Sequence, residues 1–329
     1  MQSQTKFASS ETMRSATLVA PGEFQIVEVP VPQPGPNEVR VRLEGCGVCG
    51  SNLAPFEGRP WFEYPRTAGE PGHEGWGEID TVGSDVKDFR CGERVSILSN
   101  KAFAEFDVAD QNAIVRLPPS FEKKPFPGEA LGCAMNVFRR CDVEPGQTIA
   151  IVGIGFMGAL LTALLANTGA NVIAITRRPF ALEVARSLGA RHTIAMDGHW
   201  EVIQRVKDLT GGAGCERVIE AVGAQWPLDL AAELTRERGK LIIAGYHQDG
   251  PRQVNMQLWN WRGIDVINAH ERDPRIYQRG MQAAVDAVAS GRLDPLPLYT
   301  HTFPLEKIGD AFKTMAARPD GFMKAIIKL

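Results

Sequence analysis

The 329-residue sequence lacks long uninterrupted apolar runs and any excess of charge of one sign. A membrane-spanning helix needs about 20 apolar residues in a row, so we expect no membrane span. Lys and Arg number 36 and Asp and Glu number 39, which gives a formal charge of −3 and no electrostatic attraction to nucleic acid. The N-terminus, MQSQTKFASSET, also lacks the apolar core of a secretory signal. We therefore expect a cytoplasmic protein with a disordered extension over residues 1–12.

Cysteine is scarce, and its spacing does not suggest a disulfide framework. In a cytosolic protein such residues are thiols or metal ligands. The six positions are Cys46, Cys49, Cys91, Cys133, Cys141 and Cys215. Cys46 forms a CxxC with Cys49, but no second CxxC accompanies it, so a zinc finger is not indicated. A packed, buried role suits Cys46 better.

The pattern of the chain changes between its first and second parts. Short segments such as SATLVA and QIVEVPVP, separated by Gly and Pro, continue to about residue 127 and predict strands. From about residue 141, apolar strands alternate with helical stretches, which is typical of a doubly wound parallel sheet. The length suggests two domains. We expect an α/β protein with a β-rich domain over 13–140 and 274–329 and a parallel-sheet domain over 141–273.

Gly153, Gly155 and Gly158 form a GxGxxG pattern between the strand TIAIV and the helix FMGALLTALLANTG. In that context the first glycine permits a tight turn, the second lets the backbone approach a pyrophosphate, and the third lets the helix pack on the strand. The helix N-terminus then favours the anion. The pattern predicts a dinucleotide site, with a glycine-rich turn that binds nothing as the alternative.

The end of the next strand favours NADP over NAD. An NAD site usually places a carboxylate there to bind the ribose 2′-hydroxyl. This chain instead has Thr176 followed by Arg177 and Arg178. The guanidinium groups of the two arginines suit a 2′-phosphate. A solvated arginine pair is the alternative.

Three short segments carry residues that suit catalytic zinc. They are Gly45–Asn52 (GCGVCGSN), Pro71–Gly75 (PGHEG) and Gly128–Cys133 (GEALGC). Thiolate, imidazole and carboxylate together favour zinc over magnesium or calcium.

With these motifs in this order, the chain from residue 13 onward resembles the medium-chain dehydrogenase/reductase superfamily, and most of all its zinc-dependent sorbitol and polyol dehydrogenase branch. The resemblance implies a GroES-like catalytic domain and a Rossmann nucleotide-binding domain. It implies an enzyme that interconverts a small secondary alcohol and its ketone with NAD(P). It also implies a homodimer or homotetramer, in which the strand expected over Trp261–Asn268 pairs with its copy.

The resemblance also assigns roles to individual residues. Cys49 and His73 match zinc ligands, and Glu74 matches a ligand or a carboxylate beside the metal. Ser51 matches the proton-relay hydroxyl. Lys324, in the expected last strand, matches a basic residue that contacts the cofactor phosphate.

The third zinc ligand has two candidates, Glu129 and Cys133. They lie four residues apart, on one face of a helical turn. Ligand softness favours Cys133, whereas the ungapped register from the glycine-rich turn favours Glu129. We favour Glu129.

The chain departs from this family at several points. Asn52 and Ala54 stand where relatives often have Asp and His, which leaves the route of proton exit open. Residues 96–103 (SILSNKAF) hold no cysteine where relatives carry a structural zinc, so we expect one catalytic zinc and no structural zinc. His247 and His270 follow late strands and either line the crevice or serve a structural role. The alternatives in function are a zinc-free NADPH-dependent quinone or alkene reductase of the same fold, and a non-catalytic nucleotide-binding protein.

Overall fold

The computed structural model describes residues 12–329, which form two compact units. The first comprises residues up to 127, 302–313 and 326–329, and the second comprises 128–301 and 314–325. The expected extension over 1–12 falls outside the described residues, except that Thr12 already begins the first strand. No helix within residues 12–329 is long and apolar enough to cross a bilayer.

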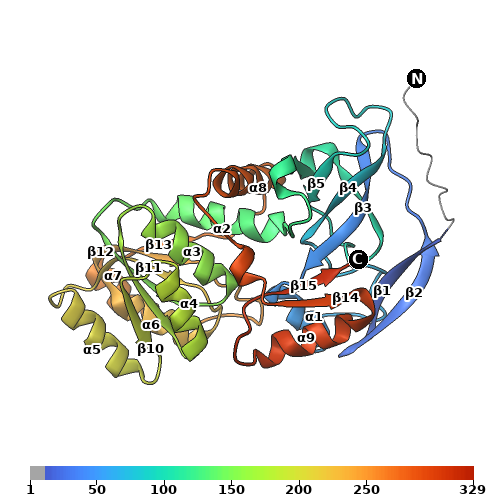
Figure 1. Cartoon of the computed structure of the whole chain (residues 1–329). Coiled ribbons are helices and arrows are strands. Elements are labelled where there is room, and N and C mark those ends of the chain that lie inside the picture. Colours follow the sequence, from blue (N-terminus) through green and yellow to red (C-terminus); the bar gives the residue numbers. More distant parts are fainter. Residues whose placement is uncertain (1–11) are drawn as a thin grey trace. The chain divides into compact units, whose positions relative to one another are not determined.

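The first unit is built mainly of antiparallel strands (Figure 1). β1 and β2 pair as a two-stranded sheet, and the others form a seven-stranded sheet in the order β14-β15-β3-β4-β5-β7, with β6 also paired to β3. The strands are β1 (Thr12–Ala20), β2 (Glu23–Pro30), β3 (Glu38–Gly47), β4 (Gly75–Val82), β5 (Arg94–Ile97), β6 (Phe106–Asp110), β7 (Ile114–Arg116), β14 (His301–Pro304) and β15 (Ala325–Lys328). The helical elements are η1 (Gly50–Asn52), α1 (Leu53–Phe56), η2 (Gln111–Ala113), η3 (Pro119–Phe121), η5 (Leu305–Lys307) and α9 (Ile308–Ala317), whose last residues belong to the second unit.

Aromatic side chains form much of this unit's core. The ring of Phe312 lies 4.9 Å from that of Phe24, 5.1 Å from that of Phe56 and 5.8 Å from that of Phe103, measured between centroids. Large rings that bury together contribute most of the apolar area that stabilises a small β-sheet.

The second unit is a six-stranded parallel sheet in the order β10-β9-β8-β11-β12-β13. Its strands are β8 (Thr148–Val152), β9 (Asn171–Thr176), β10 (His192–Ala195), β11 (Cys215–Glu220), β12 (Thr235–Ile243) and β13 (Asp265–Asn268). Its helices are α2 (Gly128–Cys141), α3 (Phe156–Ala166), α4 (Pro179–Ser187), α5 (His199–Leu209), α6 (Gln225–Leu234), α7 (Met256–Arg262), α8 (Pro274–Ala289) and the short η4 (Leu296–Leu298). The strand order reverses between β8 and β11, which is where doubly wound sheets bind their ligands.

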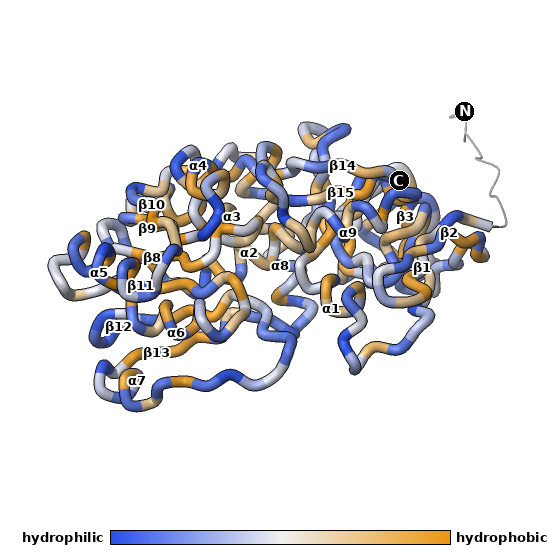
Figure 2. Tube along the Cα trace, turned by 90° about the horizontal axis from the view of Figure 1, so that it is seen from below, coloured by the Kyte–Doolittle hydropathy of each residue, from blue (hydrophilic) through white to orange (hydrophobic). Residues whose placement is uncertain are grey.

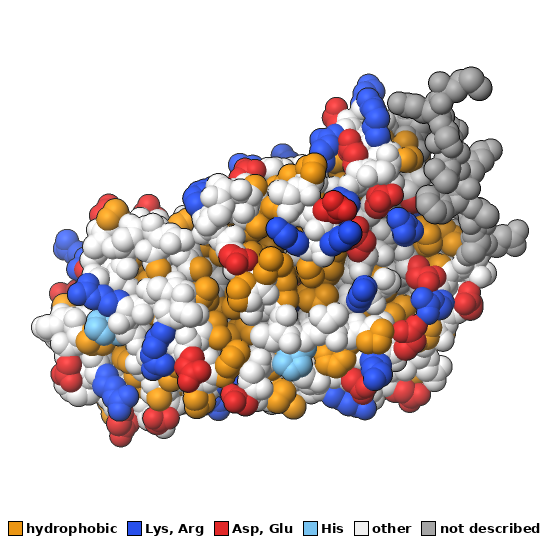
Figure 3. All heavy atoms as spheres, viewed as in Figure 1, with side chains coloured by type: hydrophobic (Ala, Val, Ile, Leu, Met, Phe, Trp, Pro, Cys, Tyr) orange, Lys and Arg blue, Asp and Glu red, His pale blue; other side chains and the backbone are white. Residues whose placement is uncertain are grey.

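Burial explains the sequence pattern of this sheet. TIAIV in β8 and NVIAIT in β9 are almost continuously apolar because helices cover both faces, and the two strands are almost fully buried. Figure 2 shows hydrophobic stretches along the elements of this unit, with hydrophilic loops between them. On the face shown in Figure 3, acidic and basic side chains are interspersed, which agrees with the balanced charge of the sequence.

The compact units differ from the expected domain limits at two helices. α2 and α8 were expected with the β-rich domain, but they pack on each other and belong to the second unit. Gly132 explains the close packing, since a Cβ there would lie 2.7 Å from the backbone nitrogen of Met281. The N-terminal segment of the first unit therefore ends at residue 127, where the run of short strands in the sequence also ends.

Two expectations need correction, whereas the expected domain limits stay a prediction. The segment Trp261–Asn268 is not one strand, because α7 runs to Arg262 and Gly263 ends that helix in the left-handed region, at φ 59°. Only Asp265–Asn268 forms β13. Lys324 lies just before β15 and not within it.

Candidate metal centre and nucleotide site

The pairing of β3 with β4 brings Cys49 close to His73 and Glu74. The two strands are antiparallel, and Cys46 near the end of β3 lies opposite Gly75 at the start of β4. Cys49 follows β3 and caps η1, while His73 and Glu74 directly precede β4. Residues 24 positions apart in the chain therefore meet at one end of the sheet.

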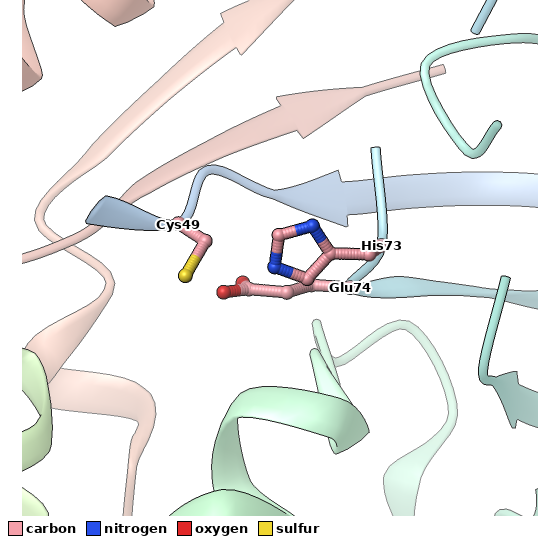
Figure 4. A group of neighbouring side chains, drawn as sticks. All are labelled: Cys49, His73 and Glu74. Atoms are coloured by element: carbon pink, nitrogen blue, oxygen red, sulfur yellow. The ribbon is translucent and has the colours of Figure 1, made fainter. Parts of the chain in front are cut away.

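The three side chains offer a compact set of donor atoms. One ligand atom from each of Cys49, His73 and Glu74 lies within 4.8 Å of the others, and Figure 4 shows the three groups pointing toward one another. Zinc bonds of about 2.0–2.3 Å in a tetrahedral arrangement place ligand atoms about 3.3–3.8 Å apart. The donor types and the spacing both fit zinc after small side-chain movements.

The hydrogen bond of His73 sets which nitrogen faces a metal. Its Nδ1 lies 2.9 Å from the carbonyl oxygen of Pro71. A carbonyl only accepts, so Nδ1 carries the proton and donates it, and Nε2 keeps its lone pair. Metal-binding histidines are commonly oriented in this way.

Glu74 is fully buried, and Gly47 makes the space for its carboxylate. A Cβ at residue 47 would lie 1.9 Å from Oε2 of Glu74. Buried carboxylates are costly unless they are paired or coordinate a metal. The position of Glu74 beside a thiol and an imidazole suits the second of these.

Ser51 lies in η1, two residues after Cys49, and is half-buried. Its Oγ donates to Oδ1 of Asn52 over 3.4 Å. Asn52 is buried, and its Nδ2 has no hydrogen-bond partner among the described residues. A hydroxyl and an unused amide donor therefore accompany the thiol of the candidate metal centre.

Glu129 and Cys133 belong to the second unit, in the first turns of α2. Both are partly buried, and Sγ of Cys133 donates to Oε1 of Glu129 over 3.1 Å. The helical spacing thus places the two side chains together, as expected. The choice between them as third ligand stays a prediction.

The glycine-rich turn has the expected backbone geometry. Gly153 adopts φ +102°, and Gly155 is the N-cap of α3, with no atom within 4 Å of the position that a Cβ there would take. A Cβ at Gly158 would lie 2.1 Å from the carbonyl oxygen of Gly153. The turn, the open approach to the helix N-terminus and the close helix packing are therefore all present.

The two arginines after β9 differ in their contacts. Arg177 is exposed and makes no hydrogen bond or ion pair with the described residues. Arg178 donates to the carbonyl oxygens of Phe322, over 2.5 Å, and Ile154, over 3.1 Å. Burial, and then the nearby Arg318, lower the pKa of Arg178. Arg178 braces the glycine-rich turn, while Arg177 is free to meet an anion beside the buried Thr176.

Lys324 is buried, with its Nζ 4.8 Å from the ring centroid of Phe156, the first residue of α3. Its ammonium group therefore lies beside the N-terminus of α3. Both groups attract an anion, as the predicted contact with a cofactor phosphate requires.

Glu220, His247 and Arg252 form a hydrogen-bonded network that the sequence alone does not predict. Glu220 contacts His247, which contacts Arg252, at the ends of β11 and β12. Of these three residues, the sequence points only to His247, which either lines the crevice or serves a structural role. No local motif predicts this network, because Glu220 and His247 lie 27 residues apart.

Comparison with known proteins supplies independent information. A family model for the alcohol dehydrogenase GroES-like domain matches residues 35–119. A family model for zinc-binding dehydrogenases matches residues 153–290. The two matches fall in the first and second units respectively.

Individual relatives agree with these matches. The sorbitol dehydrogenase of Bacillus subtilis (strain 168) is 26% identical over 338 residues, which cover 92% of this chain and 93% of the relative. A protein described as a zinc-binding dehydrogenase from Sinorhizobium meliloti 1021, solved bound to NADP, has a TM-score of 0.84 at 22% identity and covers 97% of this chain and 100% of its own. A quinone oxidoreductase from Pseudomonas syringae pv. Tomato has a TM-score of 0.82 at 23% identity, covering 96% and 100%. At these identities the two structures establish the fold alone.

Proposed function

The chain belongs to the medium-chain, zinc-type alcohol dehydrogenase superfamily, and from this premise we propose that it is a zinc-dependent oxidoreductase that interconverts a secondary alcohol and its ketone. The alcohol is of the polyol, sugar or amino-alcohol type, and the cofactor is NADP in preference to NAD. The single observation that carries the proposal is the cluster of Cys49, His73 and Glu74. A reductase that works without a metal has no need of that donor set.

The residues of the first unit would hold the metal and move the proton. Cys49 and His73 are the proposed ligands, with Glu74 as a ligand or as the carboxylate beside it. Zinc, when bound, supplies a Lewis acid for the substrate oxygen. Ser51 Oγ would accept the proton that leaves the alcohol while passing its own proton on toward the cofactor ribose or solvent. Asn52 holds that hydroxyl in place through Oδ1 and keeps an amide donor available for the substrate.

The residues of the second unit would hold the cofactor. The N-terminus of α3 and Lys324 receive the pyrophosphate, and Arg177 receives the 2′-phosphate beside Thr176. Arg178 contributes by keeping the carbonyl of Ile154, within the glycine-rich turn, in place. The nicotinamide, when bound, supplies the hydride chemistry, and the protein supplies its orientation.

Metal analysis combined with an activity panel tests the proposal. Protein from zinc-replete growth should contain about one zinc per chain, on ligand-count grounds. Hydride transfer should appear with polyols, amino-alcohols or their ketones and should prefer NADPH to NADH. Zinc-free protein that reduces quinones or activated alkenes would replace the proposal with the zinc-free reductase. Protein that binds nucleotide but transfers no hydride to any of these substrates would be a binding module.

We also propose that the chain assembles as a homodimer or homotetramer. β13 is the last strand of the parallel sheet, and its other edge pairs with no strand of the described chain. Trp261, in the helix before it, is 86% exposed. Pairing of β13 with its copy across a twofold axis would satisfy that edge. Light scattering at micromolar concentration should give at least a dimer, and a monomer refutes the assembly.

A further inference from the structure

A fully buried carboxylate stands at the carboxyl end of β11. Glu220 has no exposed surface, and its Oε1 accepts hydrogen bonds from the backbone nitrogens of Val222, at 2.7 Å, and Gly223, at 2.8 Å. The carboxylate thereby fixes the course of the chain directly after the strand. Such a group is stable in the interior only when its remaining lone pairs are also satisfied.

His247 satisfies the other oxygen of Glu220. Its Nε2 lies 3.0 Å from Oε2 of Glu220, and its Nδ1 lies 3.0 Å from Nε of Arg252. A guanidinium nitrogen only donates, so Nδ1 accepts and Nε2 carries the ring proton toward the carboxylate. The imidazole therefore links an acidic and a basic side chain in one fixed tautomer.

Arg252 closes the network onto the same loop. Its Nη2 donates to the carbonyl oxygen of Gly223 over 3.0 Å and also contacts the carboxylate of Asp249. Gly223 is thus held at its N–H by Glu220 and at its carbonyl by Arg252. The loop after β11 is therefore held on one side by the last residue of β11 and on the other by a side chain of the loop after β12.

The backbone packing shows why this loop must be held closely. A Cβ at Gly223 would lie 2.6 Å from the carbonyl oxygen of Tyr246, and a Cβ at Gly245 would lie 2.2 Å from the nitrogen of Gly223. On the other side, a Cβ at Gly153 would lie 2.4 Å from a methyl group of Val222. Val222 therefore rests against the first glycine of the nucleotide turn.

We propose that Glu220, His247 and Arg252 form a positioning network that sets residues 221–223 for the nicotinamide half of the cofactor. This inference rests on the proposed function. The 2′-phosphate residues follow β9, on one side of β8, whereas the network lies at the ends of β11 and β12 on the other side. A dinucleotide that crosses the strand ends at the glycine-rich turn places its two halves on these two sides. The network therefore acts on the nicotinamide half of the cofactor.

Binding measurements on variants of His247 test this role without any need for turnover. The wild type, His247→Leu and His247→Gln are titrated with NADPH and, separately, with 2′-phospho-AMP, which lacks the nicotinamide half. His247→Leu removes the donor to a buried carboxylate, so the Kd for NADPH should rise about tenfold. The Kd for 2′-phospho-AMP should stay within about twofold of the wild-type value. His247→Gln, whose amide has both a donor and an acceptor, should restore most of the NADPH affinity.

Two further variants separate positioning from stability. Arg252→Gln breaks the network at its partly exposed end, where folding is less at risk, and should give the same selective loss of NADPH. His192→Leu, at the amino end of β10, is the matched control and should leave both affinities unchanged.

The remaining outcomes are also decisive. If either network variant lowers the melting temperature but leaves NADPH affinity unchanged, or weakens both ligands equally, the network is only structural and the inference is overturned. If the wild type binds neither ligand, the proposed function itself fails.

Discussion

The candidate metal centre and the candidate nucleotide site are formed in different ways. In the first unit, side chains create the site: Cys49, His73 and Glu74 converge because β3 and β4 pair. In the second unit, the backbone creates it, through the turn at Gly153 and the N-terminus of α3. There the polar side chains mainly brace the backbone, as Arg178 and Glu220 do.

This difference predicts how each site tolerates substitution. A metal site depends on a few donor atoms, so one change should abolish its chemistry. A nucleotide site spreads its contacts over many backbone groups, so single side-chain changes should alter affinity and selectivity by smaller factors. The following variants are ordered by the effect that this contrast predicts.

Substitution of a proposed metal ligand should have the largest effect. Cys49→Ser or His73→Gln should remove zinc and lower kcat/KM by at least about a thousandfold, because a Lewis acid supplies several kcal/mol and each 1.4 kcal/mol is a factor of ten. NADPH affinity should change by less than about threefold, since neither Cys49 nor His73 is among the groups proposed to receive the cofactor phosphates. Elemental analysis and a fluorescence titration measure the two quantities. If both variants keep their zinc, neither Cys49 nor His73 is a zinc ligand.

Glu129 and Cys133 should differ sharply from each other. Glu129→Ala should lower zinc occupancy and activity together, by about a hundredfold or more, since even a residue that only supports a ligand is worth 10–100-fold. Cys133→Ala should keep its zinc and cost about 1 kcal/mol of packing. Metal content, activity and thermal unfolding distinguish the two. The opposite result, with zinc lost only from Cys133→Ala, identifies a site of two cysteines and one histidine.

The two arginines after β9 should have smaller and different effects. Arg177→Gln should weaken NADPH about tenfold and NADH hardly at all, because only NADPH carries the 2′-phosphate. Arg178→Gln should weaken both cofactors to a similar degree, since it releases the carbonyls of Ile154 and Phe322. The double variant should still lose NADPH affinity much more than NADH affinity. Equal losses in the double variant would contradict the preference for NADP.

The sequence predicted those parts of the molecule that depend on local order. The Gly153–Gly158 turn and the α/β alternation are confirmed, because a turn between a strand and a helix is set by adjacent residues. The role of Arg178 could not be read in this way. Its partner, the carbonyl of Phe322, lies 144 residues away.

The grouping of other segments depends on the same kind of distant contact. α2 and α8 pack closely on each other at Gly132, a contact between segments far apart in the sequence, and both fall in the second unit. The end of α7 depends on Gly263 adopting a left-handed conformation, a helix-stop signal inside a segment that otherwise alternates like a strand. Cys49, His73 and Glu74 were assigned from the resemblance to the dehydrogenase family. The pairing register of β3 with β4 is the physical reason why the three side chains meet.

The reactivity of the cysteines gives the mildest test, and it needs no substitution. Burial raises the pKa of both Cys141 and Cys215 to about 12, so at pH 8 only about one molecule in 10⁴ carries either thiolate. Iodoacetamide under native conditions should therefore leave these two second-unit thiols unmodified. Cys91, which is exposed, should react first and with no loss of activity.

Zinc should then determine the reactivity of the remaining partly buried thiols. Cys49 should be alkylated in metal-free protein and protected by one equivalent of zinc, because a coordinated thiolate is no longer free to attack. Cys133 has similar exposure, and if Glu129 is the ligand its labelling rate should hardly change when zinc is added. Peptide mass spectrometry follows both sites in one sample. Protection of Cys133 equal to that of Cys49 would mean that both thiols bind the metal, so that the third ligand comes from the thiol and not from the carboxylate of α2.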